Sequence, residues 1–307
     1  MTSTAGGILT FGDALLRTGD LDPVYTAIHR AGLDARTKGR LALSYWCFYH
    51  LGLAARLAEQ KSDRKFWELF EAAVINKDNP DGSKPYPRGA ERRHFRGDNA
   101  MKAYTHLRGR YRTPEAAIAG MLGGWPGEGY HLPFGAVSKA VQSHVGFGPW
   151  IAFKIADMNE RVLGNPVDFS DCHLGLYRDP RQGAAVALLE WSPQNQAREY
   201  ESRFGLNAKP WEYNVTDGEL KDTVTHYVKV FRKHKAPPTG DRRVNVQEVE
   251  TIFCKYKSHL GGHYRIGKDT DEVGHGLIGW GDLAEQLNQG LNDTRDRVLS
   301  WRKKNGT

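Results

Sequence analysis

Apolar residues recur every three to four positions along almost the whole of this 307-residue chain. That spacing is the period of an amphipathic helix. In "ARTKGRLALSYWCFYHLGLAARLAEQ", for example, it places Leu41, Tyr45, Phe48 and Leu51 on one face, which we expect to point into the core. Apart from a weak strand candidate at 211–215, no alternating run is long enough for a substantial sheet. The pattern therefore predicts an all-α fold.

The helical pattern also suggests how the chain is divided. We predict a helical core over 1–236, followed by a Pro-Pro-Thr-Gly linker and a C-terminal helical segment over 241–307 that packs on the core and contributes to the site. With 39% hydrophobic residues the chain can bury a sizeable core. The helices expected around the candidate site cover 91–110, 114–121 and 134–144, and a closing helix is expected over 280–301.

Composition restricts the partners and the compartment. The formal net charge of +7 favours an anionic partner, although many basic proteins bind no nucleic acid. Cys47, Cys172 and Cys254 are far apart and form no C-x-x-C pair, so neither a disulfide framework nor a zinc site is expected. Neither a signal peptide nor a run of eighteen apolar residues is found, and we expect a soluble chain without a membrane partner.

One stretch carries a more specific signal. In "HVGFGPWIAFKIADMNERVLGNPVD", Gly146 and Gly148 permit positive φ and close backbone approach, and Pro149 suits the first turn of the following helix. Free N–H groups at such a helix start can hold a phosphate. Taken alone, the glycines are more typical of an ordinary turn that binds nothing.

The order of hairpin, helix and Pro-Val-Asp resembles the helix-hairpin-helix DNA glycosylase superfamily, with the hairpin near 137–164. The resemblance implies that Gly146 and Gly148 grip the DNA backbone, and that Asp168 lies at the mouth of a pocket for a flipped base. Trp150 stands where the bifunctional glycosylases carry a Schiff-base lysine, which disfavours lyase chemistry. The structural alternative is that Asp168 serves as the N-cap of a helical segment at Ser170.

Four further segments narrow the resemblance: "TGDLDPVYTAIHRAG", "FWELFEAAV", "ERRHFRGDNAMKAY" and "QEVETIFCKYKSHLGGHYRIGKDTDE". They are similar to the alpha-glutamyl/putrescinyl thymine pyrophosphorylases of bacteriophages, also called amino acid:DNA transferases. This family implies a helix-hairpin-helix DNA glycosylase-like fold with additional C-terminal helices. It also implies that an amino acid or another amine, with glycine favoured, displaces pyrophosphate from pyrophosphoryloxymethyluracil in DNA. No phosphate-loop motif is found, so the preceding kinase step is not expected here.

The resemblance and the residue chemistry together suggest roles for individual side chains. Asp168 and Glu250 are the expected catalytic carboxylates, and Asp168 would bind or deprotonate the incoming amine. The hairpin glycines and Trp150 would contact DNA. We expect substrate or pyrophosphate contacts from Arg92, Arg93, Arg96, Lys255, Lys257 and Asp269. If the arginine segment is helical, Arg92 and Arg96 share a face, and the alternative is a solvated basic surface.

Two other functions stay open. A glycosylase that excises a modified or damaged base would use the same hairpin and Asp168, and a non-catalytic DNA-binding scaffold would use the hairpin alone. The expected partners are double-stranded DNA bearing a modified thymine and an amino acid or polyamine, in the cytoplasm of an infected bacterium. No cofactor and no metal ligand set are expected, although the acidic residues leave room for a divalent metal beside the pyrophosphate.

Overall fold

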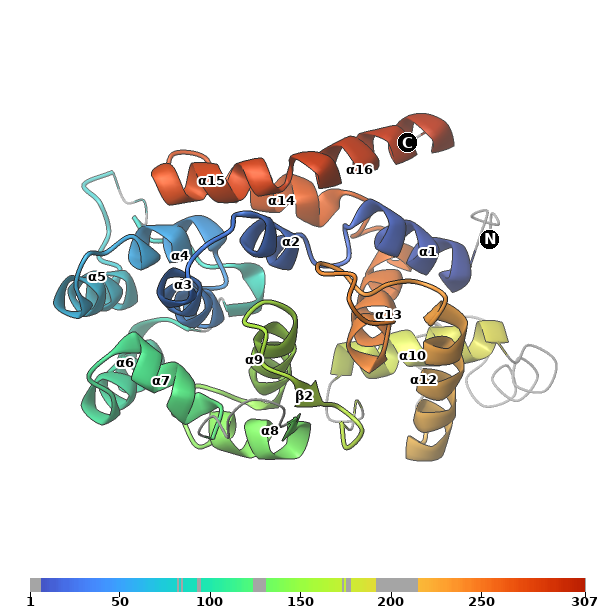
Figure 1. Cartoon of the computed structure of the whole chain (residues 1–307), viewed down its shortest axis with the longest axis horizontal. Coiled ribbons are helices and arrows are strands. Elements are labelled where there is room, and N and C mark those ends of the chain that lie inside the picture. Colours follow the sequence, from blue (N-terminus) through green and yellow to red (C-terminus); the bar gives the residue numbers. More distant parts are fainter. Residues whose placement is uncertain are drawn as a thin grey trace. The chain divides into compact units, whose positions relative to one another are not determined.

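The computed structural model describes residues 7–81, 83, 85–92, 95–123, 131–172, 174, 178–191 and 215–306 (Figure 1). Throughout these ranges the fold is all-α, as predicted, and the described strands are two residues long each. The weak strand candidate at 211–215 lies outside these ranges except for Val215. No helix in these ranges has the length and apolar character needed to cross a bilayer.

The chain forms two compact units, each assembled from segments far apart in the sequence. The hairpin unit comprises Val24–Cys172 and Asp271–Asn292. The terminal unit comprises Met1–Pro23, His173–Thr270 and Asp293–Thr307. The division into 1–236 and 241–307 remains a prediction.

The hairpin unit begins with four helices: α2 (Pro23–Arg30), α3 (Ala35–Phe48), α4 (Leu51–Ala58) and α5 (Asp63–Ile75). The continuous helical pattern of 35–60 is interrupted at Tyr49, which ends α3 in the left-handed conformation at φ 51°. His50 then caps α4, because its Nδ1 accepts the Leu53 N–H at 3.1 Å. This break lets α4 fold back and pack against α3.

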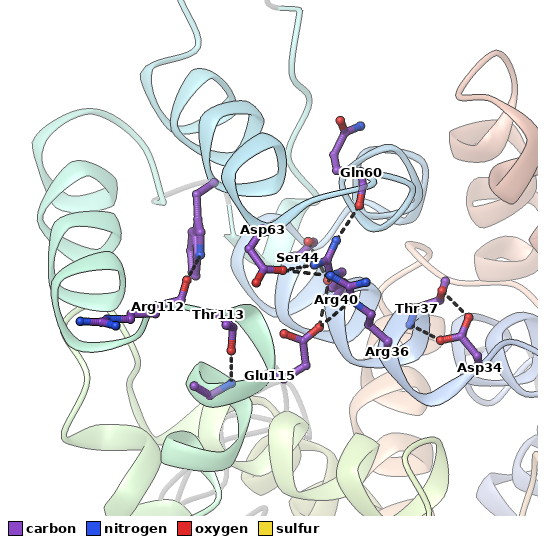
Figure 2. A network of polar contacts seen from close by, with 12 residues as sticks. Asp34, Arg36, Thr37, Arg40, Ser44, Gln60, Asp63, Arg112, Thr113 and Glu115 are labelled. Carbon is purple, nitrogen blue, oxygen red and sulfur yellow. Dashed lines mark hydrogen bonds and ion pairs between the residues drawn. The ribbon is translucent and has the colours of Figure 1, made fainter.

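A buried arginine of α3 joins the starts of two other helices in this unit (Figure 2). The Arg40 side chain is 2% exposed and binds the carboxylates of Asp63 and Glu115, with Arg40 Nε 3.2 Å from Glu115 Oε1. Its Nη1 also donates to the Gln60 carbonyl at 2.5 Å. Asp63 is the first residue of α5, and Glu115 lies in the first turn of α7 (Pro114–Met121). The guanidinium thus fixes α5 and α7 on α3.

The rest of the hairpin unit contains η1 (Ala90–Arg92), α6 (Gly97–Arg110), α8 (Phe134–Gln142), α9 (Pro149–Arg161) and α15 (Asp282–Gly290). The helix predicted over 114–121 is confirmed as α7. The single helix predicted over 91–110 is wrong, because a 3-10 turn ends at Arg92 and α6 starts only at Gly97, whose φ is +56°.

A short parallel pair closes the base of the hairpin. Strand β1 (Leu132–Pro133) precedes α8 and strand β2 (Val167–Asp168) follows α9. Leu132 pairs with Val167, and Pro133 pairs with Asp168. The Leu132 N–H also donates to the Pro166 carbonyl at 3.0 Å. Asp168 is therefore held at a defined position relative to α8 and α9.

The terminal unit is centred on α13 (Val246–Leu260), which packs against α1 (Ile8–Thr18), α10 (Arg178–Trp191) and α12 (Asp217–Phe231). Capping boxes begin α12 at Thr216 and α13 at Asn245. Helix α14 (Lys268–Leu277) starts in this unit. The closing helix predicted over 280–301 is wrong, because the chain turns at Leu291 between α15 and α16 (Asn292–Asn305).

The Arg40 network gives a stability prediction. Replacing Arg40 by Ala removes a buried guanidinium with its hydrogen bonds to the Gln60 carbonyl and to two partly exposed carboxylates, and we expect the free energy of unfolding to fall by about 2 kcal/mol or more. Arg36→Ala is the matched control. Arg36 approaches the same two carboxylates, at 3.2 Å and 3.5 Å, but is 56% exposed. Its loss should cost less than about 1 kcal/mol in urea denaturation. Equal losses for the two variants would contradict this account.

Candidate functional site

The hairpin turn lies between α8 and α9 and matches the predicted glycine geometry only in part. Gly146 has φ +82°, and a Cβ there would lie 3.1 Å from the Cβ of Ala103. Gly148 has φ −92° and is the N-cap of α9, and a Cβ on it would meet nothing within 4 Å. Gly146 is therefore required by the fold, whereas the space beside Gly148 is open to a ligand.

Arg92 lies beneath this turn and not on a solvated face. It is 1% exposed, and its Nη1 donates to the Gly146 carbonyl at 3.1 Å while its Nε donates to the Cys47 carbonyl at 3.3 Å. The guanidinium carbon lies 4.6 Å from the ring centroid of Phe95 and 5.2 Å from that of Phe147. The pyrophosphate contact expected of Arg92 is not supported, since the side chain is enclosed by the hairpin and α3.

The other two arginines of this stretch differ from Arg92. Arg96 is exposed at the N-cap of α6, so it shares no helical face with Arg92, and the predicted i, i+4 pair does not form. Arg93 lies outside the described residues. Of the two arginines of this cluster that the structure describes, Arg96 is exposed and can contact an anionic ligand, whereas Arg92 is enclosed.

Trp150 in the first turn of α9 contacts an aromatic residue that the sequence did not single out. The rings of Trp150 and Tyr49 have centroids 5.4 Å apart, and Tyr49 stacks on Tyr45 at 4.5 Å. Both Tyr49 and Trp150 are half-buried. Helical periodicity could not identify Tyr49, because its side-chain direction is set by the left-handed break after α3. The structure thus places an aromatic pair beside the hairpin.

Asp168 is exposed at the end of β2. Its Oδ1 accepts the Ser170 N–H at 2.8 Å, and its Oδ2 accepts the Ser170 hydroxyl at 2.9 Å. These two hydrogen bonds hold the pKa of the carboxyl below its ordinary value, and the nearby His131 lowers it further. The turn-forming role and an anionic surface role therefore coexist in this residue.

The histidine nearest to the turn is fully engaged. His144 is 2% exposed; its Nδ1 lies 2.9 Å from the Ala140 carbonyl and its Nε2 lies 2.8 Å from the Tyr111 hydroxyl. Burial is the main cause that lowers the pKa of His144. A neutral ring that donates from Nδ1 and accepts at Nε2 satisfies both contacts.

The remaining expected site residues belong to the terminal unit. Lys255 Nζ contacts the Asp20 carbonyl at 2.6 Å, the Tyr264 hydroxyl at 3.1 Å and Asp269 Oδ2 at 2.6 Å. Burial opposes the charge of Lys255, but the carboxylates of Asp269, Asp20 and Asp22 outweigh it and raise its pKa. The three ammonium N–H groups are thus used within the protein, which argues against the pyrophosphate contact expected of Lys255.

The two other candidates on α13 differ in exposure. Glu250 is 1% exposed and its Oε2 accepts the Thr251 hydroxyl at 3.1 Å. Lys257 Nζ lies 2.9 Å from Asp179 Oδ1 in a surface ion pair. The structure therefore joins Lys255 with Asp269 in this unit and Arg92 with Gly146 in the hairpin unit.

Among the described residues, no group of three His, Cys, Asp or Glu side chains forms a cluster that could hold a metal ion.

The position of Arg92 gives a second prediction. We expect Arg92→Gln to lower the free energy of unfolding by about 2 kcal/mol or more, because the buried carbonyl of Cys47 and the carbonyl of Gly146 lose a charged donor. Arg96→Gln, four residues along the chain from Arg92 and exposed, should leave it within about 0.5 kcal/mol. Urea denaturation of both variants tests this. A fully stable Arg92→Gln protein that no longer binds inorganic pyrophosphate would restore the ligand-contact role.

Comparison with known proteins adds to this geometry. A family model described as "Amino acid:DNA transferase" matches residues 15–264. A glycinyltransferase of Pseudomonas phage PaMx11 is 38% identical over 276 residues, which cover 90% of this chain and 91% of that protein. A putrescinyltransferase of Delftia phage PhiW-14 is 29% identical over 284 residues, covering 91% of this chain and 81% of that protein. The chain belongs to the amino acid:DNA transferase family.

Proposed function

We propose that this protein transfers an amino acid, with glycine favoured, to the C5-methylene of pyrophosphoryloxymethyluracil in DNA and releases pyrophosphate. The observation that carries the proposal is its similarity to a phage glycinyltransferase over nearly the full length of both chains. The lower identity to a putrescinyltransferase is the reason for preferring glycine over a polyamine. By the same similarity to phage proteins, we place it in the cytoplasm of an infected bacterium.

The proposed step is a substitution at the methylene carbon. The lone pair of the neutral amine forms the C–N bond as the C–O bond to pyrophosphate breaks, and the electron pair of that bond leaves with the pyrophosphate. The attack leaves an extra proton on the nitrogen, and this proton passes to solvent, so the products are the amine-bearing base, pyrophosphate and one proton. The electrophile is good, so the protein must chiefly hold the base and the amine in line and accommodate negative charge on the leaving group.

Asp168 is the carboxylate that we assign to the amine. Its lowered pKa keeps it anionic at neutral pH, as required to attract an ammonium group, and its exposure leaves it accessible. Base flipping would bring the methylene out of the duplex toward such a residue. Arg96 and Arg93 are retained as candidates for the pyrophosphate, whereas Glu250 is assigned a supporting role because it is buried.

Replacing Asp168 by Asn tests this assignment. We expect turnover to fall about 100-fold or more while DNA affinity stays within about twofold, since the amide keeps the size but loses the charge. Asp171→Asn is the matched control: Asp171 Oδ2 accepts the Gly135 N–H at 2.9 Å and lies in the same loop. The measurement is mass spectrometry of nucleosides from DNA carrying pyrophosphoryloxymethyluracil after incubation with glycine.

The same assay separates the alternatives. Release of a free base without an amine-bearing nucleoside would identify a glycosylase. Unchanged modification by Asp168→Asn in infected cells would favour a non-catalytic scaffold. Either result would reject the proposed transfer by this residue.

Ser170 gives a pH prediction. Both of its hydrogen bonds favour the ionised Asp168, so Ser170→Ala removes the hydroxyl donor and raises the pKa of Asp168 toward its ordinary value. Activity that needs the carboxylate anion is lost as pH falls through that pKa. The acid limb of the kcat/KM profile should therefore move to higher pH. Thr225→Ala, which removes a hydroxyl bonded only within α12, should not move it.

A further inference from the structure

Helix α6 borders the hairpin turn within the hairpin unit. A Cβ at Gly146 would lie 3.1 Å from Ala103, and the rings of His106 and His144 meet edge to face with centroids 5.5 Å apart. At the end of α6, the Tyr111 hydroxyl is 2.8 Å from His144 Nε2. Three successive turns of α6 therefore lie against the hairpin, and side chains on the adjoining flank of α6 lie next to the turn.

That flank is basic and polar. The buried face of α6 consists of Ala100, Ala103, Tyr104 and Leu107. Spacings of three and four residues place a second set beside it on one flank: Asn99, Lys102, His106 and Arg110. Asn99, Lys102 and Arg110 are exposed, and so is Arg96 at the N-cap.

The cations of this flank are available to a ligand. Within the part of the chain that the structure describes, no ion pair engages Lys102, Arg110 or Arg96. Asp98 is the one acidic residue of α6, and it forms no ion pair with Lys102 in the described structure. Three uncompensated cations along one side of the helix are expected to attract an extended anion rather than a protein carboxylate.

The charge of this flank also reaches the turn. Arg110 lies with its guanidinium carbon 5.6 Å from the Tyr111 ring centroid. Burial is the main cause of the lowered pKa of His144, and the positive charge of Arg110 contributes to it. His144 therefore stays neutral, and the positive potential beside the turn comes from the α6 side chains and the start of α9.

We propose that Lys102 and Arg110 of α6 form a second contact surface for the backbone of duplex DNA, next to the contact proposed for the hairpin amides. This rests on DNA being the substrate, as in the proposed function. Lys102 and Arg110 are eight residues apart, which corresponds to about 12 Å along the helix axis. A strand carries one phosphate per about 3.4 Å of axial rise, so the two side chains meet different phosphates.

This surface has a mechanical consequence for the proposed reaction. A single hairpin contact holds DNA at one point and allows it to pivot. A row of contacts on α6 fixes the direction of the backbone relative to α9, and thus relative to Asp168 on β2 of the same unit. Phosphate contacts carry no sequence information, so this surface is expected to orient DNA of any sequence equally.

The test is the salt dependence of DNA binding by the full chain. Fluorescence anisotropy with a short labelled duplex of unmodified DNA gives the observed binding constant across a range of KCl concentrations. For Lys102→Gln/Arg110→Gln we expect affinity to fall about tenfold at low salt and the log–log slope to become shallower by about 1.8, the value for two lost phosphate contacts. An unchanged melting temperature will show that the variant is folded.

Lys221→Gln/Lys229→Gln is the matched control, because it removes the same charge from exposed positions of α12. Its slope should equal that of the wild type. A wild-type slope for the α6 variant, or an equal change in both variants, would overturn the proposal. The assay requires neither modified DNA nor an amine, so its outcome does not depend on whether the protein catalyses the proposed transfer.

Discussion

The geometry of the hairpin depends on one buried cation. Arg92 donates to the Gly146 carbonyl in the turn and to the buried Cys47 carbonyl near the end of α3, and so ties the turn to that helix. By holding the Gly146 carbonyl inward, the guanidinium fixes the turn that precedes α9, and the N–H groups at the exposed start of that helix are left for a ligand. Arg92, which the sequence suggested as a ligand contact, therefore supports the backbone of the hairpin turn.

The terminal unit is organised by a buried anion in an equivalent way. The Asp20 side chain is 0% exposed, and both of its carboxylate oxygens accept hydrogen bonds. Oδ1 accepts the Thr270 N–H at 3.0 Å and the Thr270 hydroxyl at 2.6 Å. Oδ2 accepts the Tyr264 hydroxyl and the Gly267 N–H, each at 2.5 Å. Its carbonyl accepts from Lys255. Because each carboxylate oxygen is shared by two donors, these groups form one connected hydrogen-bond network. Residue types that suggest chemistry in a sequence serve here to hold α13 and the start of α14.

Sequence patterns correctly predicted the features that depend on neighbouring residues alone. The all-α fold, α7 and the turn between α8 and α9 follow from helical period, a Thr-Pro helix start and glycine. The exposure of individual side chains was harder to predict. Arg92 and Arg96 are four residues apart, yet one is enclosed and the other solvated, because Arg92 ends a 3-10 turn and α6 begins only after Arg96. Likewise, the sequence around Lys255 does not indicate that its side chain contacts Asp20, which lies 235 residues away. Tyr49 was missed because its direction depends on a left-handed residue that periodicity does not reveal.

The lowered pKa of Asp168 determines which role this carboxylate can have in the proposed transfer. A carboxylate whose pKa is lowered is a weaker base than an ordinary one, so it has little driving force to remove a proton from an ammonium group. The same shift makes it a persistent anion, which suits it to orient the amine electrostatically. Most of the barrier must then be lowered by alignment of amine, methylene and leaving group, and this alignment depends on how firmly DNA is held. In this mechanism the backbone contacts of the hairpin unit are part of catalysis, because they set the geometry in which a weakly basic carboxylate is sufficient.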